Sequence, residues 1–194
     1  MQTRRTVRQY RAIDLSLFAL ILIVFETVIV RASTRWFPQE AWTVSAVAAV
    51  TAIVMVRWGA WAGIHAVIGG IVFVLASHGT GSQYVIYGIG NLAGLAVLPL
   101  LKKWGWQKLQ SNTLLIFLYG FLTLLFMQAG RGLLSLVFGA SLSAAAGFVT
   151  TDAVSYVFTL VILWIMTRLD GMLEDQQHYL ERLNEQQEKE GGFQ

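Results

Sequence analysis

Long apolar stretches separated by short polar or charged segments run through most of this 194-residue chain. The first, Ile13–Val30, has close to the roughly 20 residues that a helix needs to cross a bilayer. Further apolar stretches follow at residues 44–56, 58–77, 84–101, 113–127 and 154–166. This pattern predicts an all-α integral membrane protein, built as a bundle of six transmembrane helices.

The second and third stretches are separated only by Arg57-Trp58-Gly59. So short a connection predicts a hairpin of adjacent antiparallel helices. Small residues then recur four positions apart in two series, Gly59 with Gly63, and Ala62 with Ala66 and Gly70. Because small side chains at this spacing let helix backbones approach closely in lipid, we expect this segment to be a packing seam.

The segment Leu133–Val149 is apolar but rich in Gly, Ala and Ser, so hydropathy alone would allow a seventh span. A seventh span would place Arg168 and the charged tail on the side opposite the N-terminus. With six spans, most basic residues lie on the cytoplasmic side, as the positive-inside rule requires. These are Arg4, Arg5, Arg8, Arg11, Arg57, Lys102, Lys103, Lys108 and Arg168. We therefore expect both termini in the cytoplasm, and residues 131–150 as a re-entrant or membrane-surface element before the last helix, shielded by protein or a cavity.

The composition supports a membrane protein, with 56% hydrophobic and 13% charged residues and a mean hydropathy of +0.59. The absence of cysteine excludes disulfides, thiolate metal sites and a cysteine nucleophile. A net charge of only +3 gives no support to a nucleic-acid partner. We expect a plasma-membrane protein with a basic cytoplasmic N-terminus (1–12), a transmembrane domain (13–170) and a charged cytoplasmic tail (171–194).

Motifs for hydrolysis or nucleotide binding are missing: the sequence has no HExxH, no GxSxG and no Walker phosphate loop. The histidines, His65, His78 and His178, are too scattered to predict a metal site. We therefore expect neither enzymatic activity nor a metal or cofactor.

Glu26 is an acidic residue at depth in the first stretch. A charge at the bilayer centre costs about 2.5 to 3.5 kcal/mol on insertion scales, so Glu26 needs a partner or water. An ion pair with Arg31 or Arg131 that fixes helix packing is one interpretation, and binding of a polar ligand group is the other.

Polar residues share helix faces in the predicted outer half of the bundle. Tyr84, Tyr87 and Asn91 are spaced i, i+3 and i+7 in the fourth stretch, and Asp152, Ser155, Tyr156 and Thr159 share one face in the last. The tyrosines also suit a membrane-interface belt, but two polar faces at one depth favour a substrate site, with Trp36 and Trp42 as a lid. The predicted substrate-binding residues are Glu26, Trp36, Trp42, Tyr84, Tyr87, Asn91, Gln128, Arg131, Asp152 and Tyr156.

The chain resembles the substrate-binding S component of energy-coupling factor (ECF) vitamin transporters. The resemblance rests on size, on six spans, on residues 57–63 leading to Gly69-Gly70, and on the segment 87–94. It implies capture of a vitamin or related micronutrient from outside, followed by docking on a transmembrane coupling protein that carries two cytoplasmic ATPases. In the family an alanine-xxx-alanine face of the first helix makes that contact. The predicted docking residues here are Ala12, Ser16, Ala19, Gly59, Gly63 and Ala66, although Ile23 continues the first-helix face.

Two other classes of function stay open at this point. One is an intramembrane enzyme that uses Glu26, Asp152 and His65 or His78 as acid-base groups. The other is a structural or assembly protein whose seams bind partners in the lipid. The substrate also stays open among thiamine, riboflavin, folate, biotin, cobalamin and a queuosine precursor.

Overall fold

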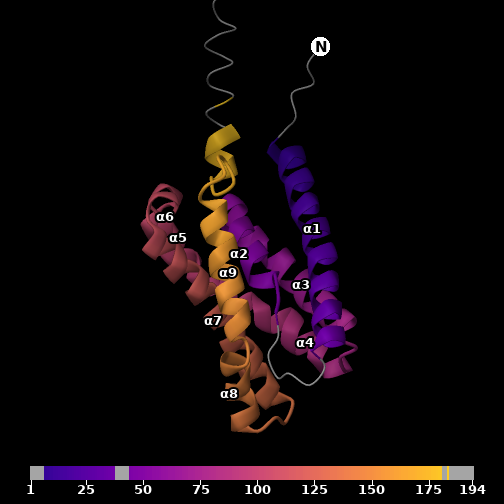
Figure 1. The fold of residues 1–194 in the computed structure, drawn as a ribbon. Coiled ribbons are helices and arrows are strands. Elements are labelled where there is room, and N and C mark those ends of the chain that lie inside the picture. The colour runs from indigo at the N-terminus through magenta and orange to yellow at the C-terminus, as the bar shows by residue number, and fades with distance from the viewer. Residues whose placement is uncertain (1–6, 38–43, 181–182, 184–194) are drawn as a thin grey trace, which may run out of the picture.

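The computed structural model describes residues 7–37, 44–180 and 183, and within them the chain is helical with no strand, as predicted (Figure 1). The elements are α1 (Val7–Trp36), α2 (Val47–Trp58), η1 (Gly59–Trp61), α3 (Ala62–Ala76), α4 (Gly81–Gly90), η2 (Asn91–Val97), α5 (Leu98–Trp104), α6 (Trp106–Ser111), α7 (Thr113–Val137), α8 (Leu142–Thr150) and α9 (Ala153–Met166).

Five helical stretches of the described chain are long and apolar enough to cross a bilayer: Val7–Trp36, Val47–Ala76, Gly81–Trp104, Thr113–Val137 and Leu142–Met166. These stretches are compatible with a multi-pass membrane protein. The second stretch reverses direction at Gly59, which has a φ of +60°. A Cβ built on Gly69 would lie 2.6 Å from Val47 Cγ2, so the start of α2 lies beside the later part of α3. The predicted antiparallel hairpin is therefore present, formed by helices of 12 and 15 residues.

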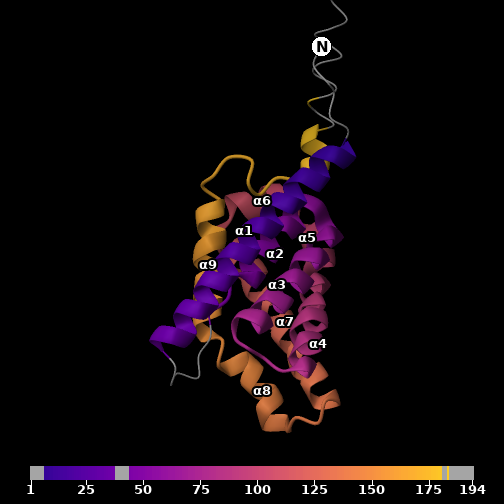
Figure 2. The same cartoon turned by 90° about the vertical axis from the view of Figure 1, so that its right-hand side faces the viewer.

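The helices form an elongated bundle with two distinct ends (Figures 1 and 2). The start of α1, the α5–α6 region and the end of α9 lie at one end, and α8 lies at the other. We name the first the basic end, because the exposed cations Arg8, Lys102, Lys103, Lys108 and Arg168 belong to these elements or follow α9 directly. The start of the first helix and the end of the last thus lie at the same end of the bundle, and the count of six spans stays a prediction.

The segment expected to be one re-entrant or surface element is instead divided between two helices. Helix α7 continues past Met127 to Val137, through Gly130, Arg131 and Gly132, and the chain turns only at Gly139, which has a φ of +85°. After this turn α8 runs back along α7, where a Cβ on Gly132 would lie 3.0 Å from the Ala145 carbonyl oxygen. The expectation of one separate element over residues 131–150 is therefore corrected.

A buried ion pair at the basic end ties α1 to α2. Arg57 donates two hydrogen bonds to the Asp14 carboxylate, at 2.9 and 2.8 Å, and Trp58 Nε1 donates a third at 2.6 Å. The sequence interpretation overlooked Asp14, although an acid near the end of an apolar helix needs a partner as much as Glu26 does. Asp14 therefore fixes where α1 sits against the hairpin.

The beginning of the predicted tail is part of the bundle. Arg57 Nη1 also donates to the backbone oxygens of Gly171 (2.9 Å) and Met172 (3.1 Å). Leu173 is completely buried in the main apolar core. The boundary at residue 171, placed where the charges begin, thus separates residues that the fold keeps together.

Candidate functional site

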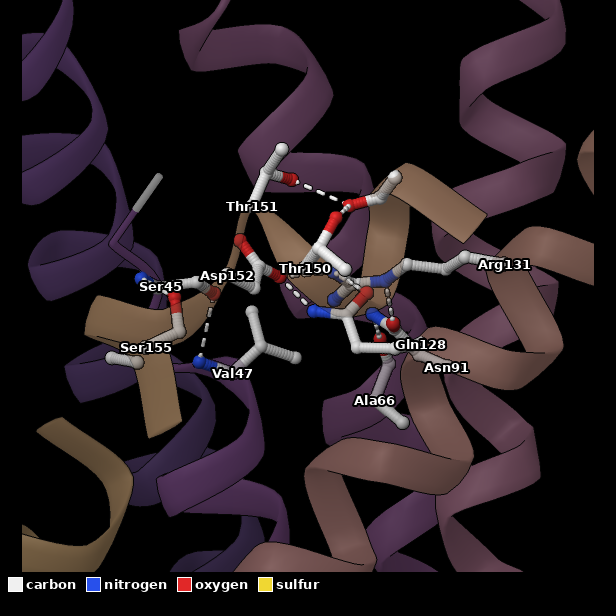
Figure 3. A network of polar contacts seen from close by, with 12 residues as sticks. Ser45, Val47, Ala66, Asn91, Gln128, Arg131, Thr150, Thr151, Asp152 and Ser155 are labelled. Atoms are coloured by element: carbon white, nitrogen blue, oxygen red, sulfur yellow. Dashed lines mark hydrogen bonds and ion pairs between the residues drawn. The ribbon is translucent and has the colours of Figure 1, made fainter. Parts of the chain in front are cut away.

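Four polar side chains meet inside the bundle, and we call them the polar cluster: Asn91, Gln128, Arg131 and Asp152 (Figure 3). Asn91 begins η2, Gln128 and Arg131 lie one turn apart on α7, and Asp152 lies at the break between α8 and α9. All four are at most 5% exposed. The sequence had placed each of them in a substrate site, and the fold brings all four together.

The hydrogen bonds of the polar cluster centre on the Arg131 guanidinium. Its Nε donates to Asn91 Oδ1 at 2.7 Å, while Nη1 is 3.3 Å from Gln128 Oε1 and 3.4 Å from Asp152 Oδ2. Gln128 Nε2 donates to Asp152 Oδ2, and Asn91 Nδ2 donates to the Ala66 carbonyl at 3.0 Å. Each amide side chain thus uses both its donor and its acceptor.

Two glycines allow this meeting of helices. A Cβ on Gly130 would lie 2.3 Å from the Gly90 carbonyl oxygen, and one on Gly90 would lie 2.9 Å from Arg131 Cα. Any side chain at either position would push α4 away from α7. The glycines of the segment 87–94 therefore place Asn91 within hydrogen-bond reach of Arg131.

The charges of Arg131 and Asp152 compensate each other in a dry environment. The guanidinium carbon of Arg131 also lies 4.7 Å from the centre of the Tyr87 ring, a cation–π arrangement. Tyr87 in turn stacks on Phe73 at 4.7 Å and contacts the Phe148 ring of α8 at 5.8 Å. The cation is thus held by both carboxylate and aromatic contacts, and α8 adds a second layer over Tyr87.

Glu26 is held by hydrogen bonds, whereas the sequence left open an ion pair or a polar ligand. Its Oε1 accepts from the Ser45 hydroxyl and its Oε2 from the Ala46 backbone N–H, both at 2.7 Å. In the part of the chain that is described, Glu26 forms no ion pair with Arg31 or Arg131. The carboxylate instead satisfies backbone and hydroxyl donors at the N-terminus of α2, where the helix dipole favours a negative charge.

Ser45 links Glu26 to the last helix, because its backbone N–H donates to Ser155 Oγ at 3.2 Å. Sequence reasoning missed this serine. A Ser shortly before a helix start is a common capping signal and was the available indication.

The other predicted site residues are less closely associated with the polar cluster. Tyr156 packs 5.1 Å from Phe121, and its hydroxyl has no hydrogen-bond partner among the residues described. Tyr84 is partly buried on α4 and takes no part in the hydrogen bonds above. Trp36 ends α1 with 71% of its surface exposed. Trp42 lies outside the described residues.

An open apolar groove of about 320 Å³ adjoins the polar cluster on the α7–α8 side. Gln128 lines it together with Ala129, Gly132, Leu133, Leu136, Leu142, Ala145, Ala146 and Val149. Within α8 only Ala145 is buried. Because α8 buries so few side chains, we expect it to be the element beside the polar cluster that moves most easily.

The predicted docking residues divide into two groups. Ala12 and Ser16 are exposed, and Ala19 and Gly59 are partly exposed. Gly63 and Ala66 are buried, because a Cβ on Gly63 would lie 3.2 Å from the side chains of Leu92 and Leu95. The surface that α1 and the hairpin offer to a partner is thus narrower than the sequence suggested.

The polar cluster contains a cation, an anion and two amides, which are groups that can bind a polar molecule. In this structure they are engaged with one another. No group of three potential metal ligands occurs among the described residues. No family model, curated protein or solved structure matches the chain.

Proposed function

We propose that this chain is the substrate-capture subunit of an ECF-type importer, embedded in the plasma membrane by six spans with both termini in the cytoplasm. The observation that carries the proposal is the position of the polar cluster. It is buried beside α8, which lies at the end of the bundle opposite the basic end. Since the basic end faces the cytoplasm under the positive-inside rule, the polar cluster is reached from outside.

The substrate is a vitamin or related micronutrient with hydrogen-bonding edges. When it binds, Arg131 turns from Gln128 and Asp152 toward the substrate. The freed Gln128 amide and Asp152 carboxylate then accept hydrogen bonds from the donors of the substrate. The two contacts of Arg131 Nη1, at 3.3 and 3.4 Å, are long for hydrogen bonds. Replacing them by contacts with the substrate therefore costs the least binding energy. Tyr87 then offers its ring to the substrate ring system.

We expect one compound of a vitamin panel to raise the thermal unfolding temperature of the purified chain, since a ligand that binds only the folded state stabilises it. The panel contains thiamine, riboflavin, folate, biotin, cobalamin and queuine. Asn91→Leu and Gln128→Leu should each weaken the binding of that compound, measured by titration, by more than about tenfold, or 1.4 kcal/mol. The exposed Gln107→Leu on α6 is the matched control. If both cluster variants bind within about threefold of the wild type, the substrate site is elsewhere.

The proposed partner is a transmembrane coupling protein with two ATPases, which docks on the exposed small residues of α1 and on Gly59. Ser16→Trp should reduce co-purification with that module and uptake, while binding by the isolated chain is unchanged. Leu17→Trp is the control, because the neighbouring residue is exposed but points about 100° away around the helix. Equal loss of assembly in both variants would contradict a docking face centred on Ser16.

A further inference from the structure

The α5–α6 region forms a basic elbow at the basic end of the bundle. Gly105, with a φ of +78°, ends α5 and lets α6 turn away. Leu101 and Leu109 are buried on the inner side of the elbow. Lys102, Lys103 and Lys108 are exposed on its outer side. The elbow is therefore amphipathic, with leucines packed against the core and lysines exposed.

A cavity of about 320 Å³ lies between this elbow, the end of α2 and the segment that follows α9. Its walls are largely apolar and come from Met55, Val56, Leu98, Leu101 and Trp106. Lys102, Asp175 and His178 supply the charged and polar lining, and Gly59 and Gly105 complete it. The cavity thus combines an apolar interior with a cation from the basic elbow.

The acidic residue in this lining is already engaged. Asp175 Oδ1 accepts from the backbone N–H of Gln177 at 2.9 Å and of His178 at 3.4 Å, and so caps the following helical turn. Lys102 is the lysine of the lining, and Lys103 and Lys108 are exposed on the same elbow, so an anion that enters from this surface meets three lysines. Trp104 and Trp106 add indole rings, which prefer the headgroup level of a bilayer.

We propose that this cavity binds an anionic phospholipid from the leaflet around the basic end. Part of one acyl chain lies in the cavity along Val56 and Leu98, and Lys102, Lys103 and Lys108 attract the phosphate. A free phosphate would gain nothing from the apolar walls, and a zwitterionic lipid would gain little from three lysines. The site is separate from the polar cluster and does not depend on the proposed transport function.

The test compares the full chain in nanodiscs of phosphatidylcholine alone and of phosphatidylcholine mixed with phosphatidylglycerol. We expect phosphatidylglycerol to raise the thermal unfolding temperature. We also expect native mass spectrometry to show a retained phosphatidylglycerol that survives detergent exchange. The triple variant Lys102→Gln, Lys103→Gln, Lys108→Gln should lose more than about half of the shift and most of the retained lipid.

Controls separate this site from general attraction to a charged membrane. The double variant Arg31→Gln, Arg35→Gln removes two cations far from the cavity, on the last turns of α1. It should keep the full thermal shift and the full lipid retention with phosphatidylglycerol. Leu98→Gln should reduce lipid retention with all lysines present. Equal stabilisation by phosphatidylcholine, unchanged retention in the triple lysine variant, or the same shift from inorganic phosphate in detergent would each overturn the proposal.

Discussion

Asp152→Ala is expected to destabilise the protein by about 3 kcal/mol and to abolish substrate binding. The substitution leaves the Arg131 cation buried, with only the oxygens of Asn91 and Gln128 as acceptors. Breaking a buried ion pair by removing one partner typically costs about 3–5 kcal/mol, because the remaining charge is uncompensated. Equilibrium unfolding in mixed micelles measures the stability, with Asp170→Ala, an exposed acid beyond α9, as the control.

A double variant separates the structural part of this effect from the binding part. Arg131→Met combined with Asp152→Leu removes both charges, and such replacements are often neutral for stability. We expect the double variant to recover most of the stability and still to bind none of the panel compounds. Recovery of both stability and binding would show that the pair serves only to hold α7 and α9 together.

Much of the polar cluster was predictable because helical periodicity does not require knowledge of the tertiary fold. The spacing of Tyr87 and Asn91 placed both on one face, and the contacts of both with Arg131 agree with that. The cost of a buried charge also indicated that Glu26 needs a partner. One of its two partners, the Ala46 backbone N–H, carries no side-chain signal and lies 20 residues away in sequence. Backbone donors of this kind follow only from the fold.

The wrong predictions from the sequence also concern features that depend on the tertiary fold. Hydropathy describes how apolar a segment is, but it does not show where one helix ends and the next begins. The end of α7 was therefore misplaced, although Gly139 marks the turn. Leu173 was assigned to a charged tail because its neighbours in sequence are charged, whereas its contacts come from the core. Gly63 and Ala66 have the composition of a docking surface, and only their burial against η2 shows that they pack internally.

The second large effect is expected from fixing α8 to α7. The chain contains no cysteine, so Gly132→Cys together with Ala145→Cys creates a single thiol pair. A Cβ at position 132 would lie 3.9 Å from the Ala145 Cβ, within the range of about 3.5–4.5 Å found in disulfides. The bond should form on mild oxidation and hold α8 in the position seen here.

With α8 fixed, substrate binding should slow by at least about tenfold, and a reducing agent should restore it. The reason is that α8 reaches the polar cluster in two ways. Phe148 contacts Tyr87, which lies against Arg131, and Asp152 follows directly after α8. A displacement of α8 therefore uncovers Tyr87 and draws Asp152 from Arg131 in one movement. Stopped-flow binding of the panel compound measures the rate, with each single cysteine variant under oxidant as the control. An unchanged rate in the oxidised double variant would place the access route away from α8, between α1 and the start of α2, where the Glu26 carboxylate lies.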